Sequence, residues 1–282
     1  MQSKVFSSNK TLNLCGRLLD LNTPKVMGIL NVTPDSFYDG GRYTDDQSIL
    51  GQVEKMQRDG ADVIDVGGYS TRPGAKEISG GEELERVVNA IRIILKAFPE
   101  SILSVDTFRS SIAKAAVMEG ACMINDISGG ELDEKMFDTV AYLQVPFVLM
   151  HMRGTPQTMS SLSQYDNLLK DITVYFHKKI NRLHELGVND IIIDPGFGFA
   201  KTVEQNFELL KNLNYLKILG KPILAGLSRK STIWRTLETS PEESLNGTTV
   251  LNTVALLNGA NLLRVHDVRE AVECIRLFAH LK

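Results

Sequence analysis

The sequence predicts an α/β protein whose strands and helices close into a (β/α)8 TIM barrel, preceded by a short N-terminal extension. From residue 26 onward, short runs rich in Val, Ile and Leu alternate eight times with longer segments of helical periodicity. The runs are almost continuously apolar, which is typical of parallel strands covered by helices. Eight such repeats favour a closed barrel, and an open doubly wound sheet is the structural alternative.

Each repeat has boundaries that the sequence predicts. Strands are expected at residues 26–32, 62–68, 102–107, 123–127, 146–151, 190–195, 222–228 and 261–266. Helices are expected at residues 45–59, 82–98, 109–119, 134–143, 166–186, 203–217, 241–257 and 267–280. Gly60, Gly120, Gly187 and Gly259 follow helical segments, as glycines at helix ends do, and Thr107 is placed to cap the helix after it.

Residues 1–25 fall outside the repeat and are expected to close the bottom of the barrel formed by residues 26–282. No stretch has the roughly 18 consecutive apolar residues of a membrane span, and the N-terminus lacks the apolar segment of a signal peptide, so we expect a cytoplasmic protein with no membrane partner. The 34 acidic residues outnumber the 31 basic ones, which leaves no overall basic field to bind nucleic acid.

The cysteines are Cys15, Cys122 and Cys274. They are too few and too scattered for a disulfide framework or a zinc site. We expect three small buried apolar side chains.

Polar residues gather where the apolar runs end. At or beside these ends stand Asn31, Asp65, Asp106, Asn125, Asp126, His151, Asp194, Ser228, Lys230, Arg264 and His266. Because the carboxyl ends of all barrel strands face one mouth, we expect a single pocket lined with amides, carboxylates and cations. Any one of these residues fits a turn or cap, but buried charge at so many strand ends requires partners or a ligand.

Two long loops, after the first and second strands, are expected at the same mouth. They carry Asp35, Thr71 and Arg72. A phosphate group can be bound by Thr71 and Arg72 together with Arg264 and His266. The segment Gly196-Phe197-Gly198-Phe199 lacks the spacing of a glycine-rich phosphate loop, and its aromatic residues indicate packing or stacking. The sequence contains no HExxH or GxSxG motif.

Seven segments at or beside the strand ends form an ordered series. They are Asn31-Val-Thr-Pro-Asp-Ser-Phe, Ser70-Thr-Arg-Pro-Gly-Ala, Ser104-Val-Asp-Thr, Asn125-Asp-Ile, Asp194-Pro-Gly-Phe-Gly-Phe, Ser228-Arg-Lys-Ser and Arg264-Val-His-Asp. In this order they closely resemble the motifs of the dihydropteroate synthase family, over residues 26–282. One residue departs from the pattern, because Tyr69 stands where many members of that family carry Glu.

The resemblance implies a transferase of folate biosynthesis. Such an enzyme condenses p-aminobenzoate with 6-hydroxymethyl-7,8-dihydropterin diphosphate, giving 7,8-dihydropteroate and pyrophosphate. The family uses Mg²⁺, is the target of sulfonamides and is commonly homodimeric. Two alternatives stay open: another pterin-binding barrel, such as a corrinoid-dependent methyltransferase domain, which holds no diphosphate, and a non-catalytic pterin-binding paralogue, which would have lost diphosphate or metal residues.

The same resemblance implies a role for each matching residue. The pterin-binding positions are Asp106, Asn125, Asp194 and Lys230. The diphosphate positions are Asn31, Thr71, Arg72, Arg264 and His266, with Asn31 also the Mg²⁺ ligand. The p-aminobenzoate positions are Thr71, Arg72, Pro73, Phe199, Lys230 and Ser231. The implied catalytic set is Asn31, Asp106, Asp194, Lys230, Arg264 and His266.

Overall fold

A computed structural model of the chain describes residues 10–33, 46–69 and 78–281, and it contains a nearly closed barrel of parallel strands. The barrel strands are β3 (Lys25–Asn31), β4 (Val63–Gly67), β5 (Leu103–Asp106), β6 (Met123–Asp126), β7 (Phe147–Met150), β8 (Ile191–Asp194), β9 (Leu224–Ala225) and β10 (Leu262–Val265). They pair in the order β8-β7-β6-β5-β4-β3-β10-β9, and a parallel bridge between Ile193 and Ile223 joins the two ends. The predicted barrel is confirmed, and the open sheet is excluded.

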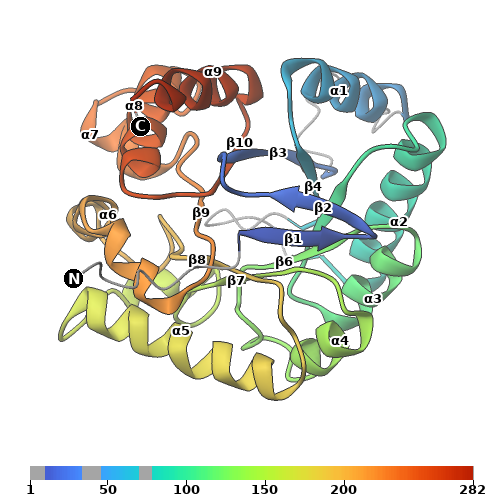
Figure 1. Cartoon of the computed structure of the whole chain (residues 1–282), viewed down its shortest axis with the longest axis horizontal. Helices are drawn as coiled ribbons and strands as arrows, with labels where there is room; N and C mark the ends of the chain where they lie inside the picture. The colour runs from blue at the N-terminus through green and yellow to red at the C-terminus, as the bar shows by residue number, and fades with distance from the viewer. Residues whose placement is uncertain (1–9, 34–45, 70–77, 282) are drawn as a thin grey trace, which may run out of the picture.

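Helices form a ring around the strands (Figure 1). They are α1 (Asp46–Asp59), α2 (Gly80–Ala97), α3 (Ser110–Met118), α4 (Met136–Leu143), α5 (Leu168–Glu185), α6 (Val203–Lys211), α7 (Ser231–Thr236), α8 (Leu245–Leu257) and α9 (Val268–Ala279). None of the helices in the described ranges is both long and apolar enough to cross a membrane.

Three local predictions are wrong. The segment 203–217 is not one helix, because α6 ends where Asn212 Nδ2 bonds the Glu208 carbonyl, and a 3-10 helix (Leu213–Leu219) follows. The short helix α7 was not predicted. The strand expected at 222–228 is only the two residues of β9, since the Ile223 N–H donates to the side chain of Asn261 and Pro222 has no N–H to donate.

Side chains alternate along each strand, and this alternation divides the barrel interior into an apolar bottom and a polar mouth. Near the amino ends of the strands, Val63, Met123, Ile192 and Leu262 belong to one buried apolar cluster. Two positions further along the same strands stand Asp65, Asn125, Asp194 and Arg264. On these four strands, polar side chains therefore enter the interior toward the carboxyl ends.

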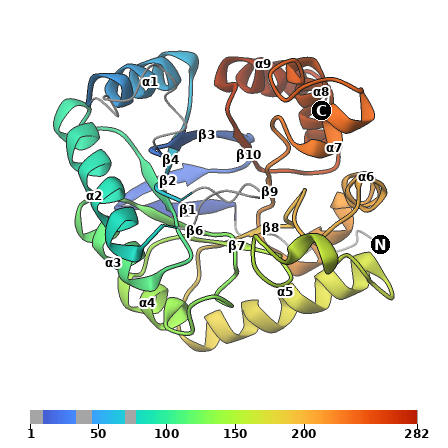
Figure 2. The ribbon, with the colours of Figure 1, turned by 180° about the vertical axis from the view of Figure 1, so that it is seen from behind.

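A two-stranded antiparallel hairpin packs on the apolar bottom. It consists of β1 (Thr11–Leu14) and β2 (Arg17–Asp20), and its residues Leu12, Leu14 and Leu19 join the same apolar cluster as the lower barrel residues. Figures 1 and 2 show the hairpin lying across the centre of the ring, on one side of the strands. The hairpin thus shields side chains that would otherwise face water.

The prediction that glycines end four of the helices is confirmed, whereas the prediction that Thr107 caps a helix is wrong. Gly60, Gly120, Gly187 and Gly259 all have positive φ, between 82° and 111°. Thr107, however, does not cap α3. Its hydroxyl donates to the buried Glu83, and Asp133 accepts from the first N–H of the helix, that of Ser110.

The prediction of three buried free cysteines is wrong for Cys15 and Cys122. Cys15 is exposed in the hairpin turn, and it forms a disulfide with Cys122 across a sequence separation of 107 residues, with the Cα atoms 5.3 Å apart. Cys274 is free and buried, as expected. Sequence distance concealed the pair, because only the docking of the hairpin places Cys15 beside the residue that precedes β6.

We predict that Cys15→Ser lowers the free energy of unfolding by about 2–4 kcal/mol under non-reducing conditions, because the disulfide limits the unfolded chain. Urea unfolding with and without dithiothreitol measures the effect. Wild type with reductant is expected to match the variant, and Cys274→Ser is expected to keep the reductant sensitivity. Wild-type unfolding that ignores the reductant contradicts the prediction.

Candidate active site

The barrel mouth brings together the predicted residues that lie in the described ranges. Asn31, Asp106 and Asp194 are the last residues of β3, β5 and β8, and Asn125 and Arg264 lie one residue before the ends of β6 and β10. His266, Phe199, Lys230 and Ser231 follow in the loops and at the start of α7. Thr71, Arg72, Pro73 and Asp35 lie outside the described residues.

Arg264 reaches into the barrel and bridges two carboxylates. Its Nε donates to Asp65 Oδ2 at 2.7 Å, and its Nη2 donates to Asp106 Oδ2 at 2.6 Å. Burial alone would lower the pKa of Arg264, but the charges of Asp65 and Asp106 raise it. Burial raises the pKa of Asp106 to about 7 even though Arg264 opposes the shift. The single positive charge of Arg264 therefore offsets only part of the negative charge that two carboxylates bring to the site.

Asn125 is oriented by the same carboxylate. Its Nδ2 donates to Asp65 Oδ2 at 2.8 Å, and Asn125 is almost fully buried. A carboxylate only accepts hydrogen bonds, so the amide nitrogen must face Asp65 and the amide oxygen points elsewhere. Asp65 Oδ1 is buried without a hydrogen-bond partner among the described residues. Asp65 thus supports Arg264 and Asn125 at once.

Asp194 is a buried carboxylate deep in the mouth, with 6% of its surface exposed. Its Oδ1 accepts from the Gly196 N–H at 2.7 Å. Burial raises the pKa of Asp194, whereas the Gly196 N–H and the positive charges of Lys230 and Arg264 lower it. The carboxylate is therefore fixed by the backbone of the loop that follows it, with three cations nearby, Lys230, Arg264 and Lys201.

Lys230 faces this loop. Its Nζ donates to the Phe197 carbonyl and lies 4.2 Å from the centre of the Phe199 ring, a cation–π contact. Burial lowers the pKa of Lys230 to about 8, and the charge of Asp194 opposes the shift. At Gly198 a Cβ atom would meet the Lys230 side chain at 3.0 Å, so the loop runs close to the lysine. Phe197 and Phe199 are both buried in apolar clusters, so the packing that the sequence indicates is present.

The loop after β9, which carries Lys230, contacts His266 through Ser228. Ser228 Oγ lies 3.1 Å from His266 Nδ1 and accepts from the His266 backbone N–H at 3.2 Å. Arg229, in the left-handed region, donates two bonds to the carboxylate of Asp267 at 2.8 and 2.9 Å. Both residues stand in matched sequence segments, but the sequence does not indicate that they pair, because they are 38 residues apart.

Asp126 has a structural role. Its carboxylate is fully buried and accepts from the Ser128 N–H, the Ser128 hydroxyl and the Gly130 N–H, each at 2.7 Å. Burial raises its pKa to about 6, and these bonds oppose the shift. A turn residue is therefore the correct interpretation of this strand-end carboxylate.

Tyr69, the departure from the family pattern, lies in a buried aromatic group. Its ring meets Phe108 edge-on with the centroids 5.3 Å apart, and the Arg109 guanidinium lies 5.4 Å from its centroid. Its hydroxyl accepts from Gln157 Nε2 at 3.2 Å. Arg109 also forms an ion pair with Glu83, which is fully buried. The buried carboxylate beside Arg109 thus comes from α2.

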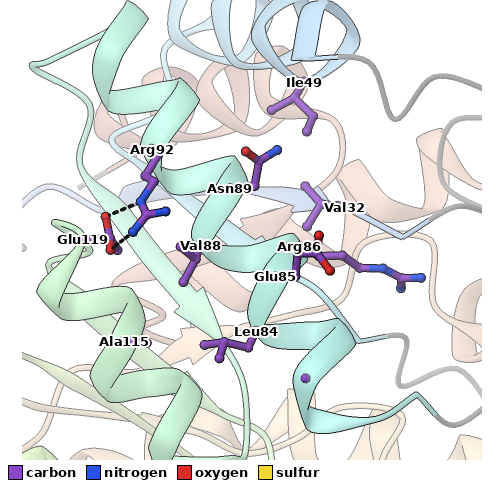
Figure 3. Close-up of a pocket in the computed structure, with 11 residues that line it drawn as sticks. Val32, Ile49, Leu84, Glu85, Arg86, Val88, Asn89, Arg92, Ala115 and Glu119 are labelled. Atoms are coloured by element: carbon purple, nitrogen blue, oxygen red, sulfur yellow. Dashed lines mark hydrogen bonds and ion pairs between the residues drawn. The ribbon is translucent and has the colours of Figure 1, made fainter.

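A hollow of about 760 Å³ lies along α2 (Figure 3). Its lining includes Leu84 and Arg86 of α2 and the ion pair between Arg92 and Glu119. None of the described strand-end residues discussed above lines it. Its lining includes Val32, which follows Asn31, and presents no converging set of buried polar groups among the described residues.

Similar proteins place this geometry in a family. A profile of the family described as pterin binding enzyme matches residues 27–266. The dihydropteroate synthase of Escherichia coli strain K12 is 41% identical over 93% of both chains. The folic acid synthesis protein fol1 of Pneumocystis carinii is 45% identical over 87% of this chain, which spans only 34% of that longer protein.

Solved structures of dihydropteroate synthases superpose closely on this chain. The Xanthomonas albilineans dihydropteroate synthase with 4-aminobenzoic acid superposes with a TM-score of 0.90 and 40% identity, covering 98% of both chains. The Yersinia pestis dihydropteroate synthase with a sulfonamide drug complex also gives a TM-score of 0.90, with 39% identity over 96% of this chain and 98% of that one.

We predict that Arg264→Met lowers the free energy of unfolding by about 3–5 kcal/mol at pH 8, because two buried carboxylates lose their shared cation. The folded pKa of Asp106 then rises further above its unfolded value of about 3.9, so the folded state binds more protons and stability falls as pH rises. The loss should therefore be smaller at pH 5 than at pH 8.

Urea unfolding at the two pH values measures this. Adding Asp65→Asn to Arg264→Met removes one of the two buried charges, and we expect it to restore part of the stability at pH 8. A loss that is equal at both pH values and unchanged by Asp65→Asn contradicts the prediction.

Proposed function

The chain belongs to the dihydropteroate synthases of the pterin-binding enzyme family, and we propose that its barrel mouth is the site where p-aminobenzoate displaces pyrophosphate from 6-hydroxymethyl-7,8-dihydropterin diphosphate. The observation that carries this proposal is the meeting of Asp194, Asn125, Lys230, Arg264 and His266 at one end of the barrel. The product is 7,8-dihydropteroate, made in folate biosynthesis.

The buried amide and carboxylate suit a pterin. A pterin edge presents adjacent N–H donors, and the Asp194 carboxylate accepts such donors well. Asn125 turns its amide nitrogen to Asp65, so its oxygen is available as an acceptor. Asp106 and Lys230 complete the proposed pterin-binding set.

The diphosphate is proposed to lie at the outer part of the mouth, against His266, Arg264 and Asn31. Cationic donors there stabilise the charge that grows as the C–O bond breaks. Arg264 is already engaged by Asp65 and Asp106, so it has fewer free N–H groups for phosphate than an unpaired arginine. Thr71 and Arg72, the other proposed contacts, lie outside the described residues.

Mg²⁺ fits the residues present, with Asn31 as the proposed ligand. Asn31 Oδ1 lies 3.4 Å from where a Cβ of Gly67 would stand, so glycine leaves space beside this oxygen. Among the described residues, no group of three or more His, Cys, Asp or Glu could hold a metal ion. Mg²⁺ commonly takes one or two protein oxygens and completes its shell with phosphate and water. When bound, it would neutralise the leaving diphosphate.

p-Aminobenzoate attacks with the lone pair of its own amine, so the site needs no strong base. Phe199 provides an aromatic wall, and Lys230 and Ser231 lie at the start of α7 beside it. Pro73, together with Thr71 and Arg72, is proposed to complete this pocket from outside the described residues. Positioning of the two substrates then supplies most of the rate. We propose that sulfonamides compete for the same pocket.

Several expectations stay predictions. They are the cytoplasmic location, the division into residues 1–25 and 26–282, and the homodimer. Exposed apolar side chains on α8 and α9, namely Val250, Leu257 and Leu277, support a self-association surface in the last part of the chain. The corrinoid-type and non-catalytic alternatives are less well supported, because Lys230, Arg264, His266 and Asn31 are all present.

A coupled assay of pyrophosphate release tests the proposed function. Release that requires both the pterin diphosphate and p-aminobenzoate supports a synthase. Pterin binding without release supports a non-catalytic paralogue, and methyl transfer from a folate would support the methyltransferase alternative.

We predict that Asp194→Asn weakens pterin binding by about 2–4 kcal/mol, because the new amide turns a donor toward pterin N–H groups. Isothermal titration calorimetry with the free pterin measures the change. Asp126→Asn is a control carboxylate outside the proposed pterin set, and we expect it to keep pterin affinity if it folds. Unchanged affinity in Asp194→Asn removes this residue from the site.

We also predict that chelation of Mg²⁺ with EDTA abolishes pyrophosphate release while binding of the free pterin persists, since the metal acts on the leaving group. Restoring Mg²⁺ in excess of EDTA should restore release. Full turnover in excess EDTA would contradict the proposed role of Mg²⁺ at the leaving group.

A further inference from the structure

The loop after β8 depends on side chains for its shape. Gly196, Gly198 and Ala200 all have positive φ, between 49° and 79°, so the loop follows no regular structure. The Gly198 N–H donates to Asn206 Oδ1 at 2.7 Å, and the Ala200 carbonyl accepts from the Tyr165 hydroxyl at 2.9 Å. Each of these bonds holds the backbone from outside the loop.

Lys201 holds the loop from within. Its Nζ lies 3.0 Å from the Gly196 carbonyl, 3.0 Å from the Phe199 carbonyl and 3.1 Å from His151 Nδ1. An ammonium has three N–H donors, and these three acceptors use all of them. Burial, followed by the charge of Lys201, holds the pKa of His151 well below its usual range. His151 is therefore neutral and free to accept at Nδ1.

The bonds from Lys201 to the two carbonyls do not require its ammonium form. Burial lowers the pKa of Lys201 to about 7, while the charge of Asp194 opposes the shift. A neutral amine still donates to both carbonyls, and its lone pair accepts from His151 if the imidazole proton moves to Nδ1. Both carbonyl bonds thus persist on either side of neutral pH.

The two carbonyls belong to residues that serve different substrates. Gly196 donates its N–H to Asp194, the proposed pterin acceptor, so fixing its carbonyl side also fixes the loop beside that carboxylate. Phe199 carries the proposed aromatic wall for p-aminobenzoate. Lys201 bonds both residues and is not one of the groups proposed to contact either substrate.

Lys230 shares the task only in part. Its Nζ bonds the Phe197 carbonyl, yet the proposed function requires it to bind substrate. Lys201 bonds the Gly196 and Phe199 carbonyls and is not required to bind substrate, so it can hold this part of the loop while Lys230 binds.

We propose that Lys201, supported by His151, is a positioning residue that keeps residues 195–200 in their substrate-binding shape while Lys230 engages the substrates. This inference rests on the proposed function. It assigns Lys201, two residues after the Gly-Phe-Gly-Phe segment, a role in both pockets without contact with either substrate.

The test compares Lys201→Met with Lys221→Met. Lys221 is a matched control, because its Nζ also bonds a histidine (His184 Nε2, 2.8 Å) and a backbone carbonyl (Asn189, 3.3 Å), but at the opposite end of β8. For Lys201→Met we expect the KM for p-aminobenzoate to rise at least about 10-fold and free-pterin affinity to fall several-fold. Lys221→Met should stay within about twofold of wild type in both measurements.

A double-mutant cycle tests whether Lys201 acts through Phe199. In a Phe199→Leu background, Lys201→Met should raise the KM for p-aminobenzoate by a smaller factor than in wild type, whereas independent effects would multiply. A folded Lys201→Met with the KM and pterin affinity of Lys221→Met overturns the proposal. If Lys201→Met is unfolded by circular dichroism, Lys201→Gln is measured instead, and failure of both to fold assigns Lys201 a purely structural role and also overturns it.

The proposed function can fail separately. Absence of pyrophosphate release in wild type would count against that function alone. The crystal structure of Lys201→Met then tests the positioning role without turnover, since the proposal expects Phe199 to leave its place beside Lys230, and an unmoved Phe199 refutes it.

Discussion

The buried guanidinium of Arg264 makes the polar half of the barrel interior possible. Two carboxylates, Asp65 and Asp106, enter the interior from neighbouring strands and would repel one another without a cation between them. Asn125 uses the same oxygen of Asp65 that Arg264 does, so four strands contribute to one hydrogen-bonded group. Asp65 therefore orients Asn125 and Arg264 together, and Arg264 in turn bonds Asp106.

Below this group, toward the amino ends of the strands, the barrel interior contains no such polar network among the described residues. Its lower interior is apolar, and it is covered by the leucines of the β1–β2 hairpin. The period of two along each strand separates the two regions by only two residues, as in Val63 and Asp65. Stability and chemistry thus occupy opposite ends of the same strands, which is the usual division of labour in barrels of this type.

Long cationic side chains bond the backbone of the loops after β8 and β9. Lys201 bonds two carbonyls in the loop after β8, Lys230 bonds another, and Arg229 ties the loop after β9 to Asp267. Because these cations bond backbone groups, a substitution there changes loop shape and local charge together.

Much of the fold was determined by the sequence alone, because its signals are local. Eight apolar runs, intervening helical periodicity and glycines at helix ends are each readable within a few residues, and they predicted the barrel and most of its boundaries. The polar residues at the strand ends also predicted one shared pocket, since parallel strands in a barrel must end at one mouth.

Only the tertiary structure decided which of those residues are partners. The sequence assigned Arg264 to phosphate, but nothing local shows that it bridges Asp65 and Asp106. The pairing of Cys15 with Cys122, the tie between Arg229 and Asp267 and the place of Lys201 beside His151 were equally hidden. Each joins residues brought together by barrel closure or by docking of a loop or hairpin, and hydrogen bonds and ion pairs depend on distances of a few ångströms that sequence spacing does not encode.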